Sequence, residues 1–193
     1  MALVTVHPFT FDEAIAREIV AETDPRIEHV AEALTWGADE YVLAALATFG
    51  WLLSRRSPNP SHRRLANHAL ACSLVTAVLP HLMKRVIDQE RPDRLTVEGH
   101  LRGAPFSGNA NDAFPSGHAL HVGAAVSAAT LLPAKWRNAV WTAGVVLVGT
   151  RIVLLAHWAS DVVAGLVIGA GLERGLRRLT LSPRQRRGQT RAS

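Results

Sequence analysis

The chain has 193 residues, 48% of them hydrophobic, a mean hydropathy of +0.12 and a formal net charge of +5. This apolar content is high for a soluble protein and indicates embedding in a membrane. The single cysteine, Cys72, excludes an intramolecular disulfide and a cysteine-cluster metal site. Because the basic residues are segregated along the chain, the charge pattern favours a membrane topology over nucleic-acid binding.

Residues 1–40 form an acidic amphipathic arm with 2 basic and 9 acidic side chains. No basic segment followed by a long apolar core begins this arm, so we expect no cleavable signal peptide. The spacing of apolar residues from Asp12 to Leu34 predicts one or two short helices, interrupted near Pro25. Such helices can lie on the bilayer or pack across the mouth of a helical bundle, and an acidic polar face favours packing.

Five apolar runs follow the arm and predict membrane-spanning helices near residues 41–53, 65–83, 117–133, 139–156 and 160–173. Residues 84–115 are polar and rich in Gly and Pro, which predicts a loop with at most one short helix. The last run is rich in Gly and Ala and suits close helix packing. We therefore expect an all-α, integral-membrane bundle of five to six helices over residues 41–173, followed by a basic, disordered tail at 174–193.

Two cations stand seven residues apart after the second run. Lys84 and Arg91 would share one face if the segment between them were helical, and Pro92 would end that helix. Two convergent cations form an anion site, although a Lys and an Arg in a polar segment are more often simply solvated.

The third run opens with Pro115-Ser116-Gly117-His118. A proline, a hydroxyl and a glycine predict a helix N-terminus whose free N–H groups can hold phosphate oxygens, with His118 beside the bound anion. An ordinary Pro-Ser cap with a histidine that fills space explains the tetrapeptide by itself equally well.

A cation, an imidazole and a carboxylate interrupt the apolar segment that contains Arg151, His157 and Asp161. If the residues around His157 were helical, Asp161 would lie one turn further on the same face and could hold one ring nitrogen. The other nitrogen would then be free to act as a nucleophile or a base. A satisfied polar pair between packed helices is the alternative for this motif taken alone.

Together and in this order, the three motifs resemble the signature of the type 2 phosphatidic acid phosphatase (PAP2) superfamily, over residues 41–172. They read Lys84-x6-Arg91-Pro92, Pro115-Ser116-Gly117-His118 and Arg151-x5-His157-x3-Asp161. The family usually has serine before the arginine of the third motif, where this chain has Thr150. Threonine keeps the hydroxyl, so altered packing is expected more than lost chemistry.

The resemblance implies a role for each matched residue. His157 would be the nucleophile that forms a phosphohistidine, Asp161 would orient it, and His118 would protonate the leaving oxygen and then activate water. Phosphoryl transfer mostly needs fixed positive charge and in-line placement. The phosphoryl oxygens would be bound by Lys84, Arg91, Arg151, the Ser116 hydroxyl and the Gly117 amide, and the resemblance implies no metal and no cofactor.

Charge alternation gives the expected topology. Basic and acidic residues number 4 and 0 in residues 54–64, 5 and 5 in 84–116, 2 and 0 in 134–138, and 7 and 1 in 173–193. With the spans above, the positive-inside rule places the basic loops in the cytoplasm and all three motifs on the opposite face. We therefore expect a bacterial inner-membrane protein with an extracytoplasmic active site.

The expected activity is hydrolysis of a lipid phosphate or diphosphate, such as a polyprenyl diphosphate or phosphatidic acid. A phosphatase of a water-soluble phosphomonoester and a non-catalytic PAP2-like binding or scaffold protein are the alternatives. Vanadium-dependent haloperoxidases share the motifs, but they are larger soluble proteins. A lipid substrate and the bilayer are the expected partners, nucleic acid is not, and the sequence does not specify an oligomeric state.

Overall fold

The structure is a computed structural model, and it describes residues 3–92 and 111–181. Its described part is mainly helical, with one small parallel sheet formed by β1 (Val4–Thr5) and β2 (Ile87–Asp88). The α-helices are α1 (Thr10–Glu22), α2 (Pro25–Thr35), α3 (Glu40–Ser54), α4 (Pro60–Lys84), α6 (Gly117–Ala128), α7 (Ala134–Val153) and α8 (Ala159–Thr180). Two 3-10 turns, η1 (Trp36–Ala38) and η2 (Ala129–Leu131), follow α2 and α6.

Short polar side chains set the starts of several helices. Asp24, Asp39, Asn59 and Ser116 precede α2, α3, α4 and α6, and each accepts a hydrogen bond from a backbone N–H of the first turn. These N–H groups have no partner inside their helix, so the caps fix where each helix begins. The break between α1 and α2 falls before Pro25, as the sequence predicts.

The closest helix pair in the bundle is α6 with α8, and glycine makes it possible. A Cβ atom on Gly169 would collide with the carbonyl oxygen of Leu120, and one on Gly123 with that of Leu166. A Cβ on Gly165 would lie 2.6 Å from the carbonyl oxygen of Ser116. The Gly-rich last helix therefore packs closely, as predicted, and brings the start of α8 beside the start of α6.

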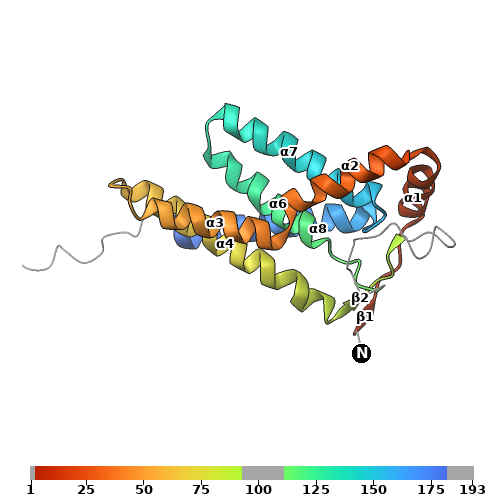
Figure 1. The fold of residues 1–193 in the computed structure, drawn as a ribbon. Coiled ribbons are helices and arrows are strands. Elements are labelled where there is room, and N and C mark those ends of the chain that lie inside the picture. The colour runs from red at the N-terminus through yellow and green to blue at the C-terminus, as the bar shows by residue number, and fades with distance from the viewer. Residues whose placement is uncertain (1–2, 93–110, 182–193) are drawn as a thin grey trace, which may run out of the picture.

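The two helical hairpins, α3–α4 and α6–α7, turn at the end of the molecule away from the small sheet (Figure 1). The opposite end holds the C-termini of α4 and α7, the N-termini of α6 and α8, and β2. Helices α1 and α2 pack against this second end, where Ala16 joins Ala113, Leu155 and Trp158 in one buried cluster. The arm of residues 1–40 thus packs against the bundle.

Four features differ from the sequence expectation. The β1–β2 pair was not expected, because two residues per strand carry no recognisable periodicity. Helix α4 ends at Lys84, so no helix connects Lys84 to Arg91. Helix α7 ends at Val153, before His157. Helix α8 continues to Thr180, so residues 174–180 are helical and not a disordered tail, while residues 182–193 lie outside the described part.

Within the described residues, α4 is long and apolar enough to cross a membrane, and α3 is a shorter apolar helix. Large apolar side chains are nevertheless exposed along several helices. They include Leu46, Phe49 and Leu52 on α3, Leu74 and Val78 on α4, Val145 on α7, and Val163 and Val167 on α8.

Candidate active site

A cavity of about 180 Å³ lies at the end of the bundle where α4 and α7 end and α6 begins. All three sequence motifs contribute to its wall. The lining residues are Asp39, Glu40, Pro80, His81, Lys84, Arg91, Gly117, His118, His121, Arg151 and His157. Of the eight predicted site residues, six therefore face one cavity.

The two cations of the first motif are joined by a carboxylate, Asp112, that the sequence did not indicate. Asp112 accepts hydrogen bonds from Nε and Nη2 of Arg91, at 2.9 and 2.7 Å, and lies 3.5 Å from Nζ of Lys84. The third guanidinium nitrogen of Arg91 donates to the carbonyl oxygen of Ala156 at 2.9 Å. The two cations converge through a shared acid instead of a shared helix face, and Arg91 also holds the backbone next to His157.

The third cation has no acid partner among the described residues. Arg151 is 3% exposed and donates from Nη1 to the hydroxyl of Thr35 on α2, at 2.9 Å. Its Nε has no hydrogen-bond partner, and no carboxylate of the described residues forms an ion pair with it. A buried, unpaired guanidinium beside a cavity is stabilised when an anion enters, because burying a lone charge is costly.

A tight turn between α7 and α8 carries His157. Leu155 adopts the left-handed region with φ 51°, and the amides of Ala156 and His157 both donate to the carbonyl oxygen of Arg151, at 3.1 and 3.3 Å. The turn therefore folds back on α7. Because α7 ends at Val153, His157 does not continue the helix that carries Arg151.

The ring of His157 is held by a backbone carbonyl. Nδ1 lies 2.6 Å from the carbonyl oxygen of Ala113, and because a carbonyl only accepts, Nδ1 carries the proton. Burial and the nearby charges of Arg91, Arg151 and Lys84 hold the pKa of His157 well below its usual range. The ring is therefore neutral near pH 7, with an unprotonated Nε2 available as a nucleophile.

Asp161 does not hold His157 in the way that the sequence predicts. Its Oδ2 accepts from the backbone N–H of Trp158 at 2.9 Å, in the first turn of α8. The prediction required a helical segment around His157, whereas the helix begins only at Ala159. Asp161 instead caps the helix that follows the histidine, and Ala113 takes the place on the ring that the sequence assigned to Asp161.

The second motif begins α6, as the sequence predicts. Ser116 is the N-cap residue, and its Oγ accepts from the N–H of Ala119 at 3.3 Å. Ser116 is fully buried and does not line the cavity, so its hydroxyl serves the cap in this arrangement. Gly117 and His118 do line the cavity, and a Cβ on Gly117 would meet no protein atom closer than 3.7 Å.

Several residues of the site escaped the sequence analysis. Asp112 and Ala113 lie just before the second motif, and residues 84–116 contain five acids, so no local signal distinguishes Asp112 from the other four. Thr35, Asp39 and Glu40 come from the N-terminal arm and the start of α3, where nothing in the local pattern indicated a site. The arm therefore contributes directly to the cavity wall.

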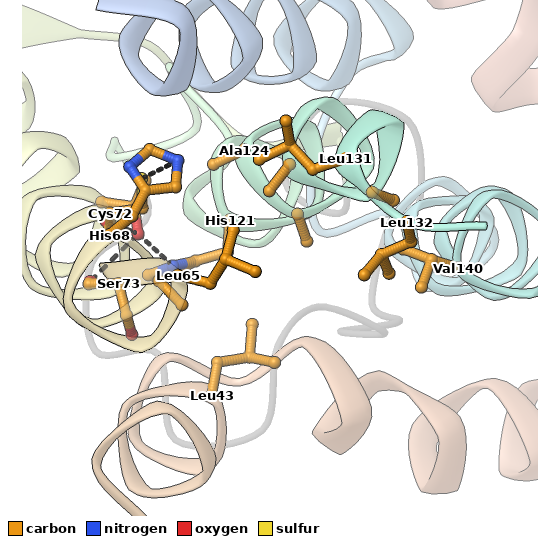
Figure 2. A pocket seen from close by; sticks show the side chains of 15 residues that line it. Leu43, Leu65, His68, Cys72, Ser73, His121, Ala124, Leu131, Leu132 and Val140 are labelled. Carbon is orange, nitrogen blue, oxygen red and sulfur yellow. Dashed lines mark hydrogen bonds between the residues drawn. The ribbon is translucent and has the colours of Figure 1, made fainter. Parts of the chain in front are cut away.

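A second, apolar cavity of about 360 Å³ adjoins the first. Figure 2 shows its lining side chains, which come from α3, α4, α6, η2 and the start of α7. His121 lines both cavities, and its Nδ1 lies 2.7 Å from the hydroxyl of Thr76. His121 therefore lies between the polar cavity and the apolar one.

Fold and site together define a helical-bundle protein with a cationic cavity and a buried, neutral histidine. The family model of the PAP2 superfamily matches residues 65–181, which include all three motifs, and the chain belongs to this superfamily. It is 43% identical over 96 residues to lipid A 1-phosphatase of Rhizobium johnstonii, and 41% identical over 95 residues to that of Rhizobium etli. Each alignment covers 49% of this chain and 39% or 41% of the relative, so the chain spans well under half of those proteins.

Solved structures show the same fold at lower sequence identity. The crystal structure of Aquifex aeolicus LpxE matches with a TM-score of 0.67 and 15% identity, over 91% of this chain and 99% of that one. The transmembrane PAP2-type phosphatidylglycerolphosphate phosphatase of Bacillus subtilis matches with a TM-score of 0.64 and 22% identity, over 92% and 88%. The bundle predicted from the sequence is therefore a PAP2 fold that includes the N-terminal arm.

Proposed function

We propose that this chain is a membrane phosphatase that hydrolyses a lipid phosphate through a phosphohistidine at His157. The observation that carries the proposal is the geometry at His157: a neutral ring with Nδ1 bound to Ala113 and three cations around the cavity that it faces. Membership of the PAP2 superfamily and the similarity to lipid A 1-phosphatases support the same reaction class.

The reaction has two steps. Nε2 of His157 attacks phosphorus while the bond to the lipid oxygen breaks, and His118 donates a proton to that oxygen. A water then attacks the phosphohistidine as His118 accepts its proton, the N–P bond breaks and phosphate is released. Lys84, Arg91, Arg151 and the free amides at the start of α6 bind the phosphoryl oxygens, on which negative charge is spread in the transition state.

Asp161 and Ser116 have supporting roles in this proposal. Asp161 holds the N–H of Trp158 and so fixes the start of α8 next to His157. Ser116 fixes the start of α6 and so the direction in which its free amides point. Both residues act through the backbone that they hold, and the phosphoryl group contacts the amides and cations.

A lipid substrate fits the surroundings of the cavity. The adjoining apolar cavity of about 360 Å³ provides space for part of an acyl chain, with His121 at the junction. The exposed apolar side chains of α3, α4, α7 and α8 indicate a bilayer around the bundle. A water-soluble phosphate ester would leave the apolar cavity unused.

The charged and aromatic side chains support an orientation in the membrane. The α3–α4 connection carries Arg55, Arg56, Arg63 and Arg64, and Arg177 of α8 reaches Ser127 and Thr130 at the same end of the bundle. Exposed aromatic rings occur near both ends, with Trp36 and Tyr41 near the active site and Trp136 and Trp141 at the far end. By the positive-inside rule, the active site faces away from the cytoplasm.

The test is phosphate release by the full-length, detergent-purified protein with excess EDTA. The substrate panel comprises lipid A with its 1-phosphate, a polyprenyl diphosphate, phosphatidic acid, phosphatidylglycerol phosphate and a soluble aryl phosphate. We expect the lipid phosphates to be hydrolysed faster than the aryl phosphate. Among them we expect lipid A to be hydrolysed fastest, because lipid A 1-phosphatases are similar in sequence to this chain. Failure of well-folded protein to hydrolyse every substrate would contradict the proposal, and preference for the aryl phosphate would contradict the lipid class.

A further inference from the structure

A carboxylate of the N-terminal arm is buried against the catalytic turn. Asp12, in the first turn of α1, is 1% exposed. Its Oδ1 accepts from the backbone N–H of Ser160 at 2.9 Å, and its Oδ2 accepts from the hydroxyl of Ser160 at 2.7 Å. Oδ2 also accepts from the N–H of Phe9 at 3.1 Å. One carboxylate therefore joins the N-termini of α1 and α8.

The N–H of Ser160 belongs to the first turn of α8, where helix amides lack partners within their own helix. Asp161 satisfies the amide of Trp158, and Asp12 satisfies that of Ser160. A carboxylate is also favoured at this end by the helix dipole. Asp12 thus completes the cap of α8 from a segment 148 residues away in sequence.

His157 lies three residues before Ser160, in a turn held at three points. Arg91 holds the carbonyl of Ala156, Ala113 holds the ring of His157, and Asp12 holds Ser160. Arg91 and Ala113 lie inside the segment that matches the family model, whereas Asp12 lies outside it. Loss of one anchor frees one side of the turn while the others stay in place.

We infer that Asp12 is a positioning residue for His157, which gives the N-terminal arm a role in the chemistry of this site. By capping α8 it fixes the backbone on the C-terminal side of the histidine and keeps Nε2 in line with phosphorus. The inference rests on the proposed function. Because a displacement of about 1 Å at a reacting group can cost about 100-fold in rate, the effect of Asp12 falls on the chemical step and spares the anion pocket.

The test compares Asp12→Ala with Glu13→Ala in the full-length protein. Glu13 is the next residue on α1, and within the described residues its side chain forms only a surface pair with Arg17, at 3.3 Å. We expect Asp12→Ala to lower kcat by about 10- to 100-fold with KM nearly unchanged, and Glu13→Ala to leave both unchanged. Asp12→Asn keeps an oxygen for the Ser160 amide but cannot accept the other two bonds, so we expect a smaller loss, of about 3- to 10-fold.

Binding of two anions separates positioning from stability. Orthovanadate imitates the phosphoryl transition state and requires His157 in line, whereas inorganic phosphate requires only the cations and amides. We expect Asp12→Ala to weaken orthovanadate binding in proportion to kcat and to leave phosphate binding unchanged. If Asp12→Ala does not fold, Asp12→Asn supplies the same comparison.

Wild-type kcat per folded molecule in Asp12→Ala, or in Asp12→Asn where only that variant folds, would overturn the inference. Equal weakening of vanadate and phosphate binding would also overturn it, since Asp12 would then maintain the whole pocket. An inactive wild-type protein that binds neither anion would instead refute the proposed function, so the two failures are distinguishable.

Discussion

The bundle contains two buried polar clusters that differ in how completely their charges are paired. In the cluster remote from the active site, Glu173 is fully buried and every contact is short. Its oxygens accept from His68 at 2.9 Å, from Ser127 at 2.6 Å, and from Nε and Nη2 of Arg177 at 2.8 Å each. This cluster joins α4, α6 and α8 and leaves no charge without a partner.

In the cluster at the active site, the charges are not fully paired among the described residues. Lys84 and Arg91 share one acid, Asp112, and Arg151 has none among the described residues. Charge that is paired within the protein holds helices together, whereas unpaired charge beside a cavity is available to an anion. We therefore expect the Glu173 cluster to stabilise the folded bundle and the cations at the active site to bind the substrate phosphate. Each expectation can be tested by substitution.

The largest expected effect is that of the nucleophile. His157→Ala should abolish turnover, with a loss of more than about 10⁴-fold, because no phosphohistidine can form. The protein should remain folded, since within the described part of the chain the ring makes a single hydrogen bond, to Ala113. The check is phosphate release together with thermal unfolding in detergent, with the exposed His29→Ala as control. Normal turnover in purified His157→Ala would refute the assignment of His157 as the nucleophile.

Removing the unpaired cation should have the next largest effect. Arg151→Met should lower kcat by about 10²- to 10³-fold, as loss of one donor to a developing oxyanion does, without lowering stability. Its side chain leaves no acid unpaired in the described part of the chain. The exposed Arg178→Met on α8 is the control, and similar turnover in the two arginine variants would contradict the assignment.

The paired cluster should respond in the opposite way. Glu173→Ala leaves His68 and Arg177 without their acid, so we expect the free energy of unfolding to fall by roughly 3 kcal/mol. For a chain of this size that corresponds to a loss of roughly 10 °C in the midpoint of thermal unfolding. Turnover per folded molecule should stay near that of wild type. A variant with wild-type stability and little turnover would reverse the roles of the two clusters.

The smallest expected effect is a shift in pH dependence. The charge of Arg151 helps to hold the pKa of His157 low, so its removal in Arg151→Met should raise that pKa toward the usual value. Protonated His157 is inactive, and the acid limb of kcat/KM should therefore move to higher pH. The measurement compares the two proteins over pH ~5 to 8 with one lipid substrate, so that ionisation of the substrate phosphate is common to both. A shift to lower pH would contradict the electrostatic account.

The sequence was sufficient for those parts of the site that local pattern controls. The order of motifs identified His118, His157 and the three cations, and the start of α6 after Ser116 followed from its cap residue. It failed where a contact depends on how the chain turns: the Lys84–Arg91 segment is not helical, and Asp161 does not reach His157. In both cases the prediction assumed a continuous helix. The helix ends at Lys84 in the first case, and the chain turns at the left-handed Leu155 in the second.

What the sequence by itself determined about this protein is its helices, its family and the end of the bundle at which its chemistry gathers. Apolar runs, cap residues and short motifs encode these features among near neighbours, where periodicity and local hydrogen bonding decide. Only the tertiary structure decided the partners: Asp112 for the cations, Ala113 for His157, Thr35 for Arg151 and Asp12 for the start of α8. These contacts join segments up to 148 residues apart, and helix packing, not local pattern, selects which polar group meets which.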